Sequence, residues 1–91
     1  MQLRFYAMLR QIVGGKTVEF DLPPGATAST LLHAVVEGFP GMARYVWDER
    51  GGLAEHIRVF VDGREIRHLQ GLDTPIPPGA ELDIFPPSAG G

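Results

Sequence analysis

Hydrophobic and polar positions alternate along the first part of the chain. Apolar residues occupy every second position at Leu3, Phe5, Ala7 and Leu9. The alternation returns with apolar residues at Val18, Phe20 and Leu22. A period of two is typical of a half-buried β-strand. The Gly14-Gly15 pair between the two runs permits a reversal, because glycine reaches positive φ without steric cost. The pattern therefore predicts an N-terminal β-hairpin.

A helical period follows the Pro23-Pro24-Gly25 sequence, which ends strand pairing because proline donates no ladder hydrogen bond. Thr27 stands where a helix N-cap is expected. The apolar positions after it recur every three or four residues: Ala28, Leu31, Leu32, Val35 and Val36. Gly38 and Pro40 mark the end of the helix, and residues 42–47 (MARYVW) are expected to add a short helical turn.

Strand signals return in the second half of the chain, after an exposed connection at residues 48–55. Ile57, Val59 and Val61 lie on one parity, and Asp62-Gly63 is a hairpin-turn signal leading into a short strand near Glu65–Arg67. A last strand is expected over Glu81–Phe85, ended by two prolines.

The order of elements predicts an α+β fold in two layers, with a mixed sheet of four to five strands and one main helix on one face. A ubiquitin-like β-grasp meets this description, and other small α+β folds also fit. We expect one domain at residues 1–87 and a free C-terminal tail at residues 88–91 (SAGG).

Composition narrows the possible functions. A chain of 91 residues with 44% apolar residues suits one compact domain. The net charge of −3 gives no basic field for nucleic acid, and no run approaches the ~20 apolar residues of a membrane span. There is no cysteine, and His33, His56 and His68 match no zinc spacing, so no metal site is expected. We expect a cytoplasmic protein that is monomeric when free.

The stretch IFPPSAGG at the C-terminal end has two interpretations: a frayed terminus, or a tail that works in a partner. Extended at ~3.3 Å per residue, Pro86–Gly91 reach about 20 Å, enough to enter another protein's active site. Prolines stiffen the root of this tail, and the tip carries no side chain to obstruct a narrow channel. The reactive group at the tip is the carboxylate of Gly91, which attack on the α-phosphate of ATP would activate.

The chain has no phosphate-binding loop and no plausible nucleophile–base pair with which to catalyse that step. If Gly91 is activated, a separate enzyme that uses ATP must therefore do it. We predict a carrier or cosubstrate, which is not itself an enzyme and binds no cofactor.

Three segments resemble the MoaD/ThiS-type ubiquitin-like sulfur carriers, a family that includes the small subunit of molybdopterin synthase. They are RFYAMLRQIVGG, LPPGATASTLLHAV and IRVFVDGREIRHLQGLDTPIPPGAELDIFPPSAGG. The resemblance implies a β-grasp fold whose Gly91 is adenylated by an activating enzyme and converted to a thiocarboxylate. The thiocarboxylate then gives its sulfur to an acceptor held by a synthase. Molybdopterin formation is the first expectation, with cysteine, thiamine, thiolated tRNA or a sulfur-containing natural product as alternatives.

Two other functions stay open: a protein modifier whose Gly91 forms an isopeptide bond with lysine, and an interaction module whose tail does nothing. Ser88 stands where many relatives carry valine, so this tail is more polar. The connections WDERGGLAEH and GREIRHLQGLDTP are more similar to those of cysteine-biosynthesis carriers and small archaeal modifiers than to the shortest molybdopterin subunits.

A partner surface is predicted on the sheet face opposite the helix. Strand parity places these residues there: Arg4, Tyr6, Met8, Arg58, Phe60, Asp83 and Phe85. Exposed aromatic side chains framed by arginines are typical of interfaces, although a covering loop would also account for them. The predicted interface comprises Tyr6, Phe60, Phe85, Pro86, Pro87, Ser88 and Ala89, with Gly90 next to the reactive Gly91. Phe85 matches a position at which relatives contact their activating enzyme.

Overall fold

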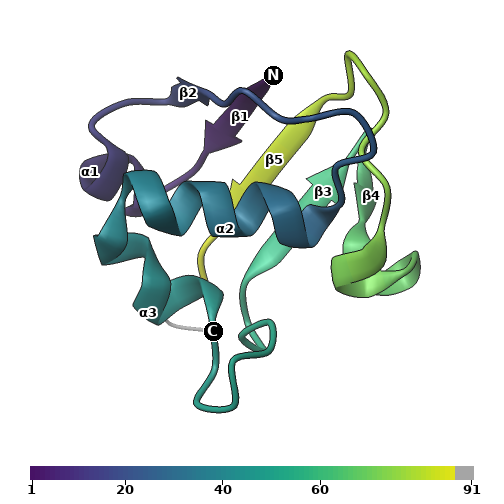
Figure 1. Cartoon of the computed structure of the whole chain (residues 1–91). Helices are drawn as coiled ribbons and strands as arrows, with labels where there is room; N and C mark the ends of the chain where they lie inside the picture. The colour runs from purple at the N-terminus through teal and green to yellow at the C-terminus, as the bar shows by residue number, and fades with distance from the viewer. Residues whose placement is uncertain (88–91) are drawn as a thin grey trace.

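The computed structural model describes residues 1–87, which fold as a mixed five-stranded sheet with one long helix across one face (Figure 1). The strands are β1 (Gln2–Phe5), β2 (Thr17–Glu19), β3 (Arg58–Val61), β4 (Arg64–Glu65) and β5 (Leu82–Phe85). Their order in the sheet is β2-β1-β5-β3-β4. The central pair β1 and β5 is parallel, and the other pairs are antiparallel. The predicted α+β class and strand number are confirmed.

The long helix is α2 (Ala28–Gly38), and it begins at the predicted cap. The Thr27 side chain accepts from the backbone N–H of Thr30, and the Thr30 hydroxyl accepts from that of Thr27 at 3.1 Å. This reciprocal pair satisfies two N–H groups that would otherwise lack partners in the first turn. After Gly38 the chain turns through a 3₁₀ helix (Pro40–Met42) into α3 (Ala43–Val46), the short helical turn that the sequence predicts.

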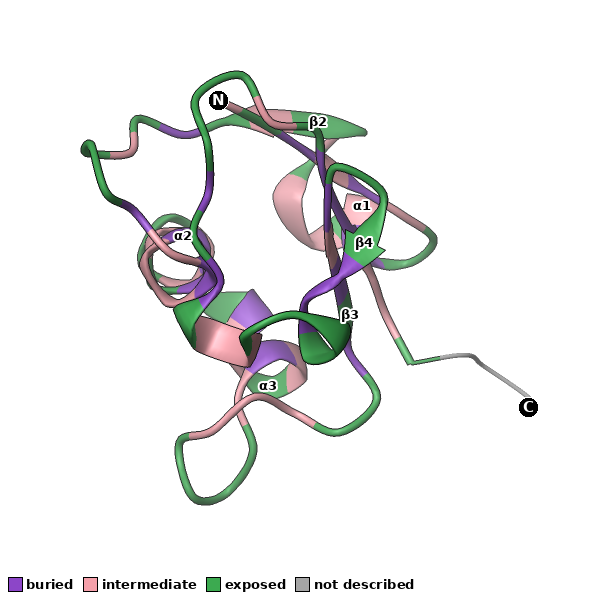
Figure 2. Cartoon of the chain, turned by 90° about the vertical axis from the view of Figure 1, so that its right-hand side faces the viewer, coloured by how far each residue is buried: buried purple, intermediate pink, exposed green. Residues whose placement is uncertain are grey.

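The hydrophobic core lies between α2 and the sheet. The helix contributes Ala28, Leu31, Leu32 and Val35, and the central strands contribute Leu3, Phe5, Val59, Leu82 and Ile84. Burying one Leu, Ile or Phe side chain stabilises the fold by roughly 1.5–3 kcal/mol. Figure 2 shows the two layers edge-on, with α2 on one side and the strands β2, β3 and β4 on the other.

The first strand is shorter than predicted. β1 ends at Phe5, whereas the alternation predicts a strand through Leu9. Ala7 adopts φ 54°, which breaks the extended conformation, and Leu9–Val13 form the short helix α1. Leu9 is still buried, but from a helix. The β1–β2 pair is therefore antiparallel as expected, but its connection contains α1, whose end is capped by Gly14 at φ 79°.

Two other predicted boundaries differ. β2 stops at Glu19, because the register pairs Glu19 with Gln2, the first residue of β1, and leaves Leu22 beyond the partner strand. The strand expected near Glu65–Arg67 is Arg64–Glu65 followed by a 3₁₀ helix (Ile66–His68), since the Glu65 carboxylate accepts from the backbone N–H of Arg67 and caps that helix. A further 3₁₀ helix spans Gly71–Asp73. The turn at Asp62-Gly63, with φ 51° and 81°, is as predicted.

Candidate functional site

The three aromatic residues predicted for the interface lie together on the sheet face opposite α2. The ring of Tyr6, just beyond β1, stacks on Phe85 at 4.1 Å between centroids and 11° between planes. The ring of Phe60 on β3 is nearly perpendicular to that of Phe85, at 82° and 5.5 Å between centroids. Such pairs add about 0.5–1.5 kcal/mol each beyond area burial. All three rings are half-buried, so each still presents surface to a partner. We call Tyr6, Phe60 and Phe85 the aromatic face.

An open depression of about 490 Å³ lies beside the aromatic face. Its lining residues come from three parts of the chain: Ala7, Met8, Arg58, Phe60, Phe85, Pro86 and Pro87. Met8 reaches it from the turn before α1 rather than from a strand, which corrects the strand-parity argument that placed it here. The lining combines two aromatic rings, the guanidinium of Arg58 and the two prolines at the root of the C-terminal tail. This arrangement suits a partner group that is apolar with an acidic edge.

Asp83 lies at the centre of the same face, on β5, and is only 8% exposed. The Arg4 guanidinium donates two hydrogen bonds to the Asp83 carboxylate, from Nε at 2.6 Å and from Nη2 at 2.9 Å. The Tyr6 hydroxyl donates to the same carboxylate at 2.8 Å. Burial by itself raises the pKa of Asp83, but the hydrogen bonds from Arg4 and Tyr6 and the charge of Arg4 outweigh it, so this pKa lies below its usual value. The hydrogen bond to Asp83, followed by desolvation, raises the pKa of Tyr6. We call Arg4, Asp83 and Tyr6 the polar triad.

A second buried carboxylate, Glu65 on β4, pairs with Arg58, which lines the depression. Arg58 Nη1 donates to Glu65 at 2.9 Å, and the backbone N–H of Arg67 donates at 3.0 Å. Burial acts to raise the pKa of Glu65, but these hydrogen bonds and the two guanidinium charges outweigh it, and the pKa lies below its usual value. The side chain of Arg58 remains 58% exposed, so it can still meet a carboxylate of a partner.

The sequence predicted that Asp83 lies on this face but not that it binds Arg4 and Tyr6. It did not predict the contacts of Glu65. The signal for Asp83 was its register, since Arg4 and Asp83 are direct cross-strand partners. That register becomes visible once β1 and β5 are recognised as parallel neighbours, which alternation alone does not reveal.

The predicted tail, residues 88–91, lies outside the described residues, and the two prolines before it lie within them. Pro86 is half-buried and Pro87 is exposed. Ser88, Ala89, Gly90 and Gly91, together with the boundary predicted at residue 88, lie beyond that part of the chain. Their roles stay predictions.

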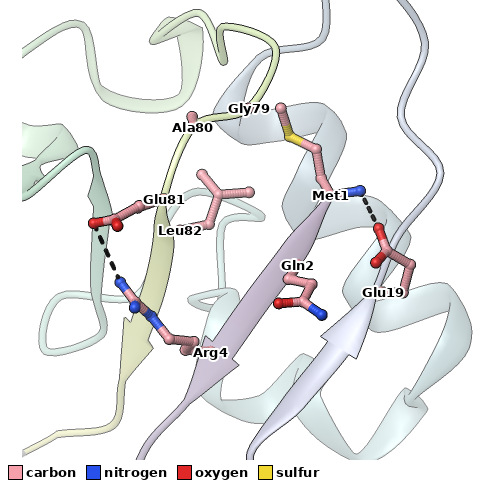
Figure 3. Close-up of a pocket in the computed structure, with 8 residues that line it drawn as sticks. All are labelled: Met1, Gln2, Arg4, Glu19, Gly79, Ala80, Glu81 and Leu82. Atoms are coloured by element: carbon pink, nitrogen blue, oxygen red, sulfur yellow. Dashed lines mark hydrogen bonds and ion pairs between the residues drawn. The ribbon is translucent and has the colours of Figure 1, made fainter.

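A second depression, of about 420 Å³, lies at the end of the sheet where β1 and β5 begin (Figure 3). Its charged groups already have partners, because Arg4 lies 3.7 Å from Glu81 and the Met1 amine contacts Glu19. β1 and β5 run parallel and both start at this end, so the chain after β5 continues from the opposite end of the sheet. The predicted interface residues do not line it. Within residues 1–87, no group of three or more His, Asp or Glu residues is placed to hold a metal ion, and no helix is long and apolar enough to cross a bilayer.

The mixed sheet with α2 across one face defines a ubiquitin-like β-grasp protein. The model of the ThiS family matches residues 3–91. The chain therefore belongs to the ThiS family of ubiquitin-like sulfur carriers, and the resemblance found in the sequence is confirmed.

Several relatives match the full length of this chain. Small archaeal modifier protein 3 from Haloferax volcanii is 33% identical over 91 residues, covering 100% of this chain and 98% of that protein. The crystal structure of SAMP1 from Haloferax volcanii superposes with a TM-score of 0.87 at 31% identity, covering 99% of this chain and 97% of the other. A chain in the BexX/CysO complex from Amycolatopsis orientalis gives a TM-score of 0.82 at 30% identity, covering 99% and 98%. These names fit the similarity to small archaeal modifiers seen in the connections of the sequence.

Proposed function

We propose that this chain is a sulfur carrier, bound by an activating enzyme through the aromatic face and loaded with sulfur at Gly91. One observation carries the proposal. The aromatic face ends at Phe85, which directly precedes Pro86-Pro87, and both prolines line the depression. A partner that covers the depression would therefore also hold the root of the tail and direct its tip into a catalytic channel.

The chemistry assigned to the tip balances without any catalytic group of this chain. A carboxylate oxygen of Gly91 attacks the α-phosphorus of ATP in the partner, and pyrophosphate leaves. A hydrosulfide then displaces AMP from the acyl carbon; alternatively a persulfide does so and a thiol cleaves the resulting S–S bond. Either route leaves a thiocarboxylate. Because the chain has no cysteine, it has no internal thiol that competes for the activated acyl group.

The acceptor is selected by the synthase pocket, because the carrier contributes only the sulfur. Molybdopterin formation is the destination that we propose first, on the family resemblance. The test offers the thiocarboxylate form separately to a molybdopterin, a cysteine and a thiazole synthase, and follows sulfur into each product. Turnover with the cysteine or thiazole synthase alone would replace the first assignment.

A second candidate is a protein modifier, favoured by the names of two relatives, small archaeal modifier proteins 3 and 1, at 33% and 32% identity. In this reaction a lysine amine of a target attacks the acyl-adenylate, AMP leaves and an isopeptide bond forms. The chain has a single lysine, the exposed Lys16. A Lys16→Arg variant therefore separates two kinds of conjugate. It would abolish conjugates formed on the lysine side chain of another copy of this chain and leave conjugates to other proteins unchanged.

Intact-mass spectrometry tests both candidates after expression with the activating enzyme from the same genome. Replacement of one oxygen by sulfur on Gly91 is expected of the carrier. Higher-mass species whose fragments contain a Gly91–lysine isopeptide are expected of the modifier. Wild-type mass alone, beside an enzyme verified to adenylate another substrate, would refute both. A variant lacking Gly91 is the matched control and should show neither product.

A further inference from the structure

The polar triad is built into the face that the proposed function uses, and its carboxylate is buried. Asp83 receives three hydrogen bonds, two from Arg4 and one from Tyr6, at 2.6–2.9 Å. The Arg4 side chain is 43% exposed, and ion pairs in contact with solvent contribute only about 0–1 kcal/mol to stability. Stability alone is therefore a weak explanation for a charged group at this position.

The contacts of the triad lead directly to the tail. Tyr6 lies beyond the last residue of β1, so the sheet ladder does not fix its ring. Its hydroxyl is anchored on Asp83 and its ring lies flat on Phe85. Phe60 meets Phe85 edge-on, so two rings hold Phe85 in place.

Phe85 is the last strand residue before the tail. The residue before a proline is restricted to extended backbone conformations, and the restriction applies both to Phe85 and to Pro86. The direction in which Pro86 and Pro87 leave the sheet therefore depends on Phe85, whose backbone pairs with Arg58 on β3 and whose ring is held by Tyr6 and Phe60.

We propose that Asp83 and Tyr6 are positioning residues: together they orient Phe85 and thereby set the direction in which Pro86 and Pro87 leave the sheet. The inference rests on the proposed function, since a fixed direction at Pro86 and Pro87 would point the root of the tail toward the partner's channel when the aromatic face docks. Pre-orientation acts on the reaction of the bound complex more than on docking itself.

The test is the Tyr6→Phe variant, which removes one hydroxyl and keeps the ring. Tyr45→Phe is the matched control, because Tyr45, on α3, is half-buried and lies outside the triad. The first measurement needs no partner: residual dipolar couplings of the amides of residues 88–90, compared with those of β5. Tyr6→Phe is expected to reduce the tail couplings, and Tyr45→Phe to leave them as in the wild type. Wild-type couplings in Tyr6→Phe would overturn the proposal whether or not the chain carries sulfur.

The second measurement uses the activating enzyme from the same genome in ATP–pyrophosphate exchange. Tyr6→Phe is expected to lower kcat by on the order of threefold to tenfold, while the dissociation constant for the enzyme changes by less than twofold. Asp83→Asn, which weakens both anchoring contacts, is expected to lower kcat further. A raised dissociation constant with unchanged kcat would make the hydroxyl a docking contact instead. A lower kcat explained by a fall in melting temperature would make its role structural. Either result overturns the proposal. Absence of exchange with the wild-type chain would instead refute the proposed function, and the dipolar couplings would then decide whether Asp83 and Tyr6 are positioning residues.

Discussion

Asp83 and Glu65 occupy positions at which strand alternation predicts solvent-facing side chains, yet both are nearly buried, at 8% and 6% exposure. The reason is local. Arg4 covers Asp83, while Arg58 and Arg67 cover Glu65, and the long apolar stems of arginine shield a carboxylate while its guanidinium pairs with it. A polar residue on the outer face of a sheet is therefore not always a solvated one.

These two carboxylates predict how stability depends on pH. The pKa of each lies below its usual value in the folded state, so the folded chain releases these protons more readily than the unfolded chain does. The resulting stabilisation is fully present above the unfolded-state pKa values of about 4 and is lost as the pH falls through the lower folded-state pKa values. We expect the urea midpoint to fall with pH below about 4.

The Glu65→Gln variant should be less stable at pH 7 and should show a shallower decline below pH 4. Glu37→Gln, at an exposed position on α2, is the control and should follow the wild-type curve. A wild-type slope in Glu65→Gln would contradict this account.

Ala7 is the second residue-scale feature, because its φ of 54° is in the left-handed region. That region costs a residue with a Cβ roughly 1–2 kcal/mol, part of which glycine regains at the expense of greater unfolded-state entropy. Ala7→Gly is therefore expected to raise the free energy of unfolding by about 0.5–1 kcal/mol in urea titration. Asp62→Gly, at φ 51°, is the instructive comparison. It should give no gain, since the Asp62 carboxylate accepts from the backbone N–H of Glu81 at 2.9 Å.

At the scale of elements, the start of α2 depends on the reciprocal contacts of Thr27 and Thr30. Thr27→Ala removes one acceptor and should lower the free energy of unfolding by about 1 kcal/mol, measured by urea titration. Ser29→Ala removes a hydroxyl on the same helix that contacts the exposed His33, so its effect should be below about 0.5 kcal/mol. Equal losses in the two variants would show that the cap is not what fixes the beginning of the helix.

The sequence predicts elements best where several local signals agree. α2 has a cap, a helical period and Gly38 as a stop, and it forms as predicted. The first strand fails because one signal, alternation, continues through Leu9 while the backbone bends at Ala7, a residue with no intrinsic preference for positive φ. A local side-chain contact spans that bend: the Arg10 guanidinium donates to the Phe5 carbonyl at 2.8 Å and joins α1 to the end of β1.

The aromatic face was predictable from parity because Phe60 and Phe85 lie on neighbouring strands of one sheet. The stacking order and the polar triad were not, since they depend on side-chain orientation and on the parallel register of β1 with β5. The thiocarboxylate at Gly91 came from the resemblance, and no local pattern of residues specifies an acceptor.

At the scale of the whole molecule, the two faces of the sheet carry different sets of residues. The face toward α2 holds the core, and the opposite face holds the aromatic face, the polar triad and the root of the tail. Substitutions on the two faces should therefore have separable effects on folding and on partner binding.

Truncation after Pro87 tests this separation most directly. The core and the helices and strands that the structure describes lie within residues 1–87, so removal of residues 88–91 should leave the melting temperature within about 2 °C of the wild-type value. The same truncation should abolish adenylation while the chain still binds the activating enzyme through Tyr6, Phe60 and Phe85, measured by calorimetric titration.

Leu31→Ala in the core should do the reverse: it should cost about 2–5 kcal/mol of stability and leave adenylation intact at temperatures where the variant is folded. A large drop in the melting temperature of the truncated chain would mean that the tail packs on the body, and a partner that binds only the full-length chain would mean that the aromatic face is not the docking surface.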